Sequence, residues 1–157
     1  MRRRVGYIAL SAALLAVVGG LAVAQAATDI TVPETIVLIS HTVKEANVNV
    51  GDNSFGPGDS FMFVTKSFDE TDQTQLGGSH VQCTIQPGKG WQFCTGAFII
   101  TGRGQIVGEG AVQFTEATTS LDVPITGGTG DFENVRGYVH VDFIDETTEK
   151  DTLYLLP

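Results

Sequence analysis

The chain has 157 residues, with 18 acidic side chains against 9 Lys and Arg and a formal charge of −9. Such an acidic surface repels phosphate polymers, so nucleic acid is excluded as an expected partner. The histidines, His41, His80 and His140, lack metal-ligand spacing, and we expect no metal site. No spacing suggests a Ser-His-Asp or Cys-His arrangement, so hydrolase chemistry is not expected either.

The first 26 residues have the pattern of a signal peptide. Arg2-Arg3-Arg4 form a basic start, an apolar run extends to about Val23, and Ala24-Gln25-Ala26 resembles a cleavage site. The alternative is a membrane anchor, but the run is near the lower limit for spanning a bilayer and no basic stop-transfer cluster follows. We therefore expect a secreted protein without membrane association after cleavage. Residues 27–157 then form one domain of 131 residues with a formal charge of −12.

Eight β-strands and no helix are predicted in the mature chain. Runs of β-branched and aromatic residues, separated by Gly, Asp and Asn, cover 35–45, 60–68, 80–85, 91–100, 105–114, 121–125, 135–144 and 152–156. The polar tracts 69–75 and 145–151 are predicted to be exposed loops. Eight strands joined by short turns favour an antiparallel barrel, lipocalin-like in shape, or a sandwich. An eight-stranded barrel has room for side chains or one small ligand.

The second predicted strand is apolar on both faces. Phe61 and Phe63 share one face, and Met62 and Val64 share the other. A strand of this kind is covered on both sides. We expect Phe61 and Phe63 to line the barrel interior and contact a ligand. The opposite face needs a second subunit as cover, which predicts a homo-oligomer, or else a loop of the same chain.

Cys83 and Cys94 are predicted to form a disulfide. They flank the turn sequence of residues 87–90, and a hairpin centred between Gly88 and Lys89 places the two cysteines opposite each other. An exported chain meets an oxidising environment, which favours the bond. The alternatives are a metal pair, which lacks a clustered His, or a reactive thiol, which lacks a base.

The same hairpin offers candidate ligand contacts. His80 and Gln82 share a face with Phe93 across the turn, where they would serve as polar and aromatic contacts in an apolar pocket. The alternative is that this face is the solvated exterior of the barrel.

Glu109 is a candidate acid–base residue because it lies between Gly108 and Gly110 in a predicted strand. Flanking glycines allow a ligand or another chain segment to approach closely. An inward, desolvated carboxyl group would have a raised pKa. The alternative is an outward Glu beside a bulge.

The segment from Ile125 to Phe132, ITGGTGDF, contains three glycines that allow a tight chain reversal after Ile125. A following helical turn would place Phe132 on the barrel end, and Arg136 would bind a carboxylate there. A phosphate-binding loop is the alternative, but it lacks the Lys of a P-loop and a long helix after it.

Three segments together resemble the allene oxide cyclase-like and dirigent-like barrel family. They are residues 58–61 (GDSF), residues 78–84 (GSHVQCT) with 91–94 (WQFC), and residues 125–132 with Arg136-Gly137. The third is the most specific, and the three span most of the chain from residue 58 to residue 137.

The resemblance implies a barrel that binds a hydrophobic small molecule and directs its cyclisation or stereoselective coupling, mainly by orientation. It implies an isomerase or cyclase type of enzyme without metal or organic cofactor, a trimer or else a dimer, and a carboxylate near the barrel mouth at Glu34. A secreted, non-catalytic ligand-binding or structural module is the alternative, because export and a disulfide depart from the intracellular cyclases.

Overall fold

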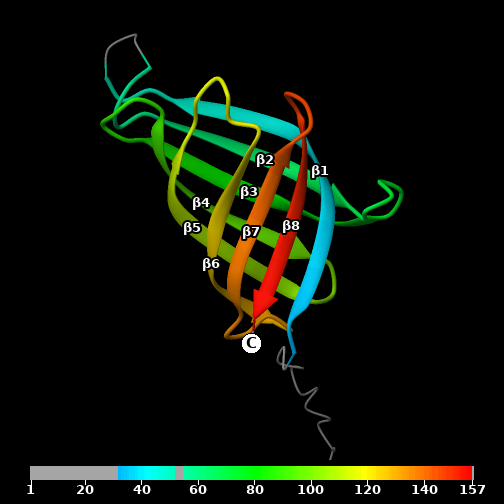
Figure 1. Ribbon diagram of the computed structural model, residues 1–157. Coiled ribbons are helices and arrows are strands. Elements are labelled where there is room, and N and C mark those ends of the chain that lie inside the picture. The colour runs from blue at the N-terminus through cyan, green and yellow to red at the C-terminus, as the bar shows by residue number, and fades with distance from the viewer. Residues whose placement is uncertain (1–31, 52–54, 157) are drawn as a thin grey trace, which may run out of the picture.

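The computed structural model describes residues 32–51 and 55–156, so the predicted signal peptide lies outside the described residues. The strands are β1 (Glu34–Val48), β2 (Ser60–Phe68), β3 (Gln75–Ile85), β4 (Trp91–Ile100), β5 (Gly104–Gln113), β6 (Ser120–Gly130), β7 (Arg136–Phe143) and β8 (Thr148–Leu156). Each pairs with its sequence neighbours, and β8 pairs antiparallel with β1 to close a barrel (Figure 1). The predicted eight-stranded antiparallel barrel is confirmed, and the sandwich is excluded.

The predicted strand bounds agree best with the structure where clear turn residues flank the strand. β2 and β4 match their predictions at both ends. β8 differs, because it begins at Thr148 rather than at Thr152. The tract 145–151 was predicted to be an exposed loop, yet its second half forms strand pairs with β1 and β7. Within the described ranges, no helix is long and apolar enough to cross a membrane.

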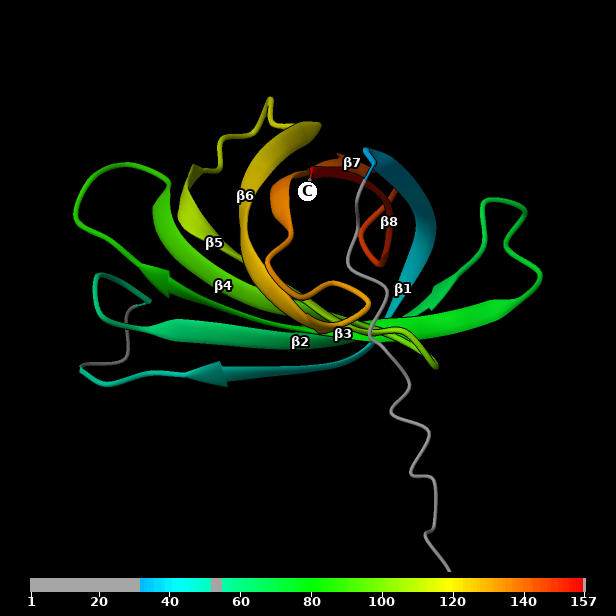
Figure 2. The same ribbon diagram turned by 90° about the horizontal axis from the view of Figure 1, so that it is seen from below.

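Apolar side chains fill one end of the barrel, which we call the closed end. It contains the β6–β7 turn and the end of β8 (Figure 2). Phe132, Leu38, Ile106 and Leu153 are fully buried there and belong to one apolar cluster. Phe132 projects from the turn after β6, as predicted, and seals this end against solvent. Any cavity in the barrel must therefore lie toward the opposite end.

A cation and two carboxylates fasten the closed end. Arg103 forms two hydrogen bonds to Glu34, at 2.7 and 2.9 Å, and one to Asp131 at 3.3 Å. Its guanidinium carbon lies 4.6 Å from the centre of the Phe132 ring. The prediction that Arg136 binds the carboxylate here is wrong. Arg136 begins β7 with an exposed side chain, whereas the β4–β5 turn directs Arg103 inward over Phe132.

The glycine segment is structural, but it does not reverse the chain directly after Ile125. β6 continues to Gly130, and of the three glycines in this segment only Gly130 has a positive φ, at 67°. A Cβ at Gly128 would lie 2.5 Å from the backbone oxygens of both Gln105 and Phe132. Glycine is therefore needed at position 128 because two segments approach its backbone closely.

Candidate functional site

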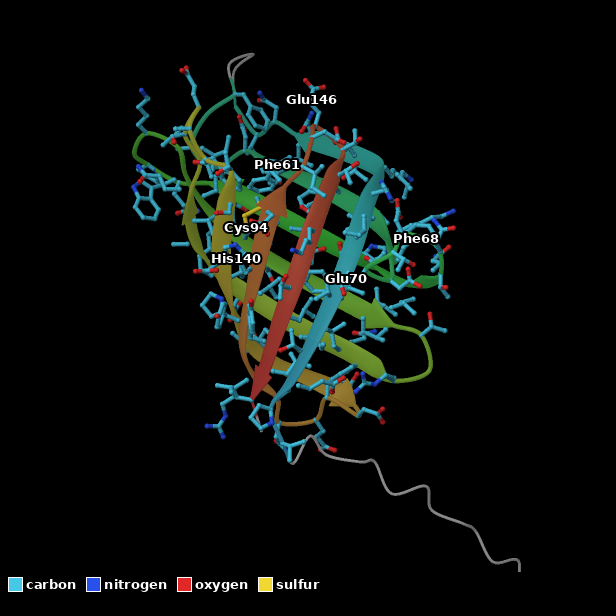
Figure 3. The ribbon with its side chains drawn as sticks, turned by 45° about the vertical axis from the view of Figure 1, so that its right-hand side comes forward. Phe61, Phe68, Glu70, Cys94, His140 and Glu146 are labelled. Atoms are coloured by element: carbon cyan, nitrogen blue, oxygen red, sulfur yellow. A yellow bond between two sulfur atoms is a disulfide. The ribbon has the colours of Figure 1, made fainter. Side chains whose placement is uncertain are left out.

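A cavity of about 470 Å³ lies at the other end of the barrel, which we call the mouth end. The β7–β8 turn lines it, and Asp145, Glu146 and Thr147 of this turn are exposed, so the cavity reaches solvent. Figure 3 shows Glu146 on this turn above Phe61 and Cys94. The volume falls within the range of roughly 300–1,000 Å³ that is typical of small-molecule sites.

The cavity walls are mainly aromatic and aliphatic. Phe61 and Phe63 of β2 stack with their ring centres 6.4 Å apart, and the ring centres of Phe114 and Phe143 are 6.0 Å apart. Valines of β3, β5, β6 and β7 add to this apolar surface. Alternation along each strand produces this surface, because every second side chain points into the barrel. Phe61 and Phe63 therefore lie where the sequence predicted them.

Cys83 and Cys94 form the predicted disulfide (Figure 3). They are register partners in the β3–β4 hairpin, with Cα atoms 4.0 Å apart. Both are buried and line the cavity. Because both sulfurs are bonded, neither serves as a metal ligand or as a reactive thiol. The bond ties two walls of the cavity together beside Phe61, the register partner of Cys83.

Two carboxyl groups on β8, Glu149 and Asp151, face into the cavity. Asp151 is fully buried, and this burial raises its pKa to about 7, against the lowering effect of a hydrogen bond from Ser40. Burial, and then repulsion from Asp151, raise the pKa of Glu149 to about 8. The two groups titrate as a coupled pair. At neutral pH the pair therefore retains a proton that it can donate within an apolar cavity.

A chain of buried hydroxyl groups holds Asp151 in place. The Ser40 hydroxyl donates a hydrogen bond of 2.6 Å to Asp151 Oδ2 and lies 2.8 Å from the hydroxyl of Ser67. Further hydrogen bonds connect Ser67 to Thr65 at 3.4 Å and Thr65 to Ser79 at 2.9 Å. The chain crosses from β8 through β1 and β2 to β3. It fixes the Asp151 side chain through Oδ2, whereas Oδ1 is buried and has no hydrogen-bond partner among the described residues.

Glu149 and Asp151 were missed at the sequence level because their tract, residues 145–151, has the composition of an exposed loop. One signal was present. Both residues lie an even number of positions from Leu153 and Leu155, so they point to the same face of β8 as these two buried core residues. Extending that alternation backwards by four residues would have placed both carboxyl groups inside the barrel.

The other predicted site residues do not line the cavity. Glu109 is exposed on the outer face of β5, and His80 and Gln82 are exposed on the outer face of β3. Phe93 is also outside, with 44% of its surface exposed. The disulfide explains the positions of His80, Gln82 and Phe93, because Cys83 and Cys94 point inward and residues an odd number of positions from them on the same strand point outward.

Glu34 lies in the closed end rather than at the mouth. Its carboxylate accepts two hydrogen bonds from Arg103, and this contact lowers its pKa. An ionised carboxylate engaged in this way is a poor proton donor. The geometry gives Glu34 a structural role in closing the barrel, at the opposite end from the cavity.

Among the residues that the structure describes, the cavity lining is acidic and contains no Lys, Arg or His. Its five carboxylic residues are Glu45, Asp145, Glu146, Glu149 and Asp151. An anionic ligand would meet repulsion here without a compensating cation. The charge distribution therefore favours neutral or cationic molecules. Within the described residues, no group of three His, Cys, Asp or Glu side chains is arranged to hold a metal ion.

No family model matches the sequence, and no curated protein matches it. Solved structures do match the fold. A pyocyanin demethylase is 23% identical, with a TM-score of 0.67, over 78% of this chain and 100% of its own. An exo-specific intermolecular Diels-Alderase is 15% identical, with a TM-score of 0.65, over 79% of this chain and 98% of its own.

A pterocarpan synthase dirigent protein is also 15% identical, with a TM-score of 0.64, over 95% of this chain and 96% of its own. The predicted resemblance to allene oxide cyclase-like and dirigent-like barrels is confirmed at the level of the fold.

Proposed function

We propose that this chain, which has the barrel fold of dirigent and cyclase proteins, binds a neutral hydrophobic small molecule and directs its cyclisation or coupling. One observation carries the proposal. An apolar cavity of about 470 Å³ contains two buried carboxyl groups with raised pKa values. Buried ionisable groups with perturbed pKa values in a cleft are typical of functional sites. The fold neighbours include a Diels-Alderase and a dirigent protein, which supports the same class of reaction.

The cavity supplies two contributions to such a reaction. The aromatic walls around Phe61 and Phe143 restrict the conformations of an apolar molecule, which favours one geometry for bond formation. The protonated carboxyl pair donates a hydrogen bond to a ligand oxygen on which negative charge develops. Exclusion of water strengthens that interaction. Neither contribution requires a metal or an organic cofactor.

A ligand screen combined with product analysis tests the proposal. Neutral polyunsaturated, phenolic and polyketide-like compounds are incubated with the protein, and complexes are identified by native mass spectrometry. Chiral chromatography then compares the products with those formed without protein. We expect one class to bind and its product to be enriched in one enantiomer. Absence of binding by every neutral compound would contradict the proposal, and binding without altered products would favour the non-catalytic module.

Replacing either carboxyl group should slow the reaction that this screen identifies. For Asp151→Asn and Glu149→Gln we expect a rate loss of about a hundredfold, because proton donation by a positioned group contributes about this much or more. Ligand affinity should change by only a few-fold, since the cavity walls remain. Glu109→Gln is the matched control, because it makes the same chemical change on the outer face of β5. Equal rates for Glu149→Gln and Glu109→Gln would exclude a role for the pair.

Secretion and oligomerisation remain part of this proposal. The predicted signal peptide supports export, and the disulfide between Cys83 and Cys94 is consistent with an oxidising compartment. On the outer face of β2, Met62 and Val64 are half-buried, and Phe93 is exposed nearby on β4. This apolar exterior supports a homo-oligomer, a trimer or else a dimer, in which a second subunit covers β2.

A further inference from the structure

Within the described residues, two buried side-chain atoms have no hydrogen-bond partner, and both belong to residues that line the cavity. They are Gln92 Oε1 and Asp151 Oδ1. A buried polar atom without a partner destabilises a protein, because it has lost its contact with water without gaining a hydrogen bond. Both residues line one apolar cavity, and a molecule bound there can supply the missing partners.

The barrel topology places these two atoms on opposite walls. Gln92 lies on β4 and Asp151 on β8, which are four strands apart in either direction around the closed barrel. They also differ in depth. Gln92 is the second residue of β4, beside the β3–β4 turn and in register with Ile85. Asp151 is in register with Leu38 and Val141, both members of the closed-end apolar cluster.

We propose that the ligand is an elongated, neutral, mainly apolar molecule with a polar group at each end. Gln92 Oε1 accepts a hydrogen bond from a hydroxyl or N–H group near the mouth, and Asp151 Oδ1 donates one to a carbonyl or ether oxygen at the cavity floor. The inference rests on the proposed function, because it names the ligand class of the same cavity. Gln92 is a specificity-determining residue in this account, without a chemical step of its own.

The chemistry of each anchor determines the group that it binds. An amide oxygen is only an acceptor, so Gln92 Oε1 requires a donor on the ligand. Ser40 already occupies Asp151 Oδ2, so Oδ1 is the oxygen that remains for the ligand. The other titratable groups that line the cavity are Glu149, Glu45, Asp145 and Glu146, all acidic. They disfavour a carboxylate at either end of the ligand.

Four probes with one ring skeleton test the two anchors separately. They are biphenyl, 4-phenylphenol, 4-acetylbiphenyl and 4-acetyl-4′-hydroxybiphenyl. Dissociation constants are measured by equilibrium dialysis against the whole mature chain. In the wild type we expect the hydroxyl group and the acetyl group each to improve affinity about tenfold over biphenyl, as a hydrogen bond to an otherwise unpaired buried group does.

The Gln92→Leu variant should lose the improvement from the hydroxyl group and keep the improvement from the acetyl group. It should fold normally, because it replaces an unpaired polar atom with an apolar group of similar size. Gln82→Leu is the matched control on the outer face of β3 and should retain both improvements. Retention of the hydroxyl effect in Gln92→Leu would overturn the assignment of that anchor.

The improvement from the acetyl group should be present at pH 5 and lost at pH 9, because an ionised carboxylate repels a carbonyl oxygen. In Asp151→Asn the improvement should not change between these pH values, since the amide retains a donor without titrating. An acetyl effect independent of pH in the wild type would overturn the second anchor. If biphenyl binds but neither polar group adds affinity, the inference fails and the proposed function stands; if none of the four probes binds, both fail.

Discussion

Replacing Phe132 with Ala is expected to lower the free energy of unfolding by about 3–5 kcal/mol, as is usual for a buried Phe. Phe132 has no exposed surface, and it fills the closed end of the barrel beneath Arg103. The loss would be a third or more of the stability of an average domain. Urea unfolding followed by circular dichroism measures it.

Phe93→Ala is the matched control for this prediction. The same atoms are removed, but Phe93 is 44% exposed on the outer face of β4. We expect a loss below about 1 kcal/mol there. If Phe132→Ala were no more destabilising than Phe93→Ala, Phe132 would not seal the closed end.

The stability of the protein should decrease as the pH rises from 4 to 9. The pKa of Asp151 rises from 3.8 to about 7 on folding, and that of Glu149 rises from 4.5 to about 8. The folded chain therefore binds more protons than the unfolded chain between these values. The contribution of the pair is complete below pH 4 and is lost as the pH passes 7–8. For Asp151 alone the decrease amounts to roughly 4 kcal/mol as an upper figure.

Melting temperatures of the wild type and of Asp151→Asn, measured across this range, test the sign and the origin of the effect. The amide cannot titrate, so the variant should show a flatter profile and should be more stable than the wild type above pH 8. Glu109→Gln, at an exposed site, should follow the wild-type profile. A wild type whose stability rises between pH 5 and pH 9 would show that the pair is not buried in its protonated form.

The fold was predictable because turn chemistry and side-chain alternation agree along most of the chain. The turn between Cys83 and Cys94 sets the hairpin register, and this register together with the expected oxidising compartment predicts the disulfide. The same register also specifies the outer face. Cys94 points inward, so the next residue on β4, Thr95, points outward. Glu109 is the register partner of Thr95 and points to the same side, which is the outer face. Gly108 and Gly110 beside Glu109 suggested a functional site, but they allow Pro124 of the neighbouring strand β6 to approach β5 closely instead.

The carboxyl pair was not predictable from composition, because Glu149 and Asp151 break the local rule that interior positions are apolar. Natural proteins break this rule mainly at functional sites. The hydroxyl chain that supports Asp151 joins Ser40, Ser67 and Ser79 on β1, β2 and β3, and it reaches Asp151 only when β8 pairs with β1 to close the barrel. Such a long-range arrangement leaves no periodic signal in one sequence. The misplacement of Glu34 has a related cause, because its partner Arg103 is 69 residues away.

The acidic, mainly apolar cavity is expected to bind neutral apolar molecules and to reject anions. Two fluorescent compounds with the same rings test it: N-phenyl-1-naphthylamine, which is neutral, and 8-anilino-1-naphthalenesulfonate, which is its sulfonated anion. We expect the neutral compound to bind the wild type at one site per chain. Val81→Trp, which fills the cavity, should abolish binding, whereas Gln82→Trp, one residue away on the outer face, should not. Tighter binding of the sulfonate, or equal binding of the neutral compound to Val81→Trp and Gln82→Trp, would contradict the account.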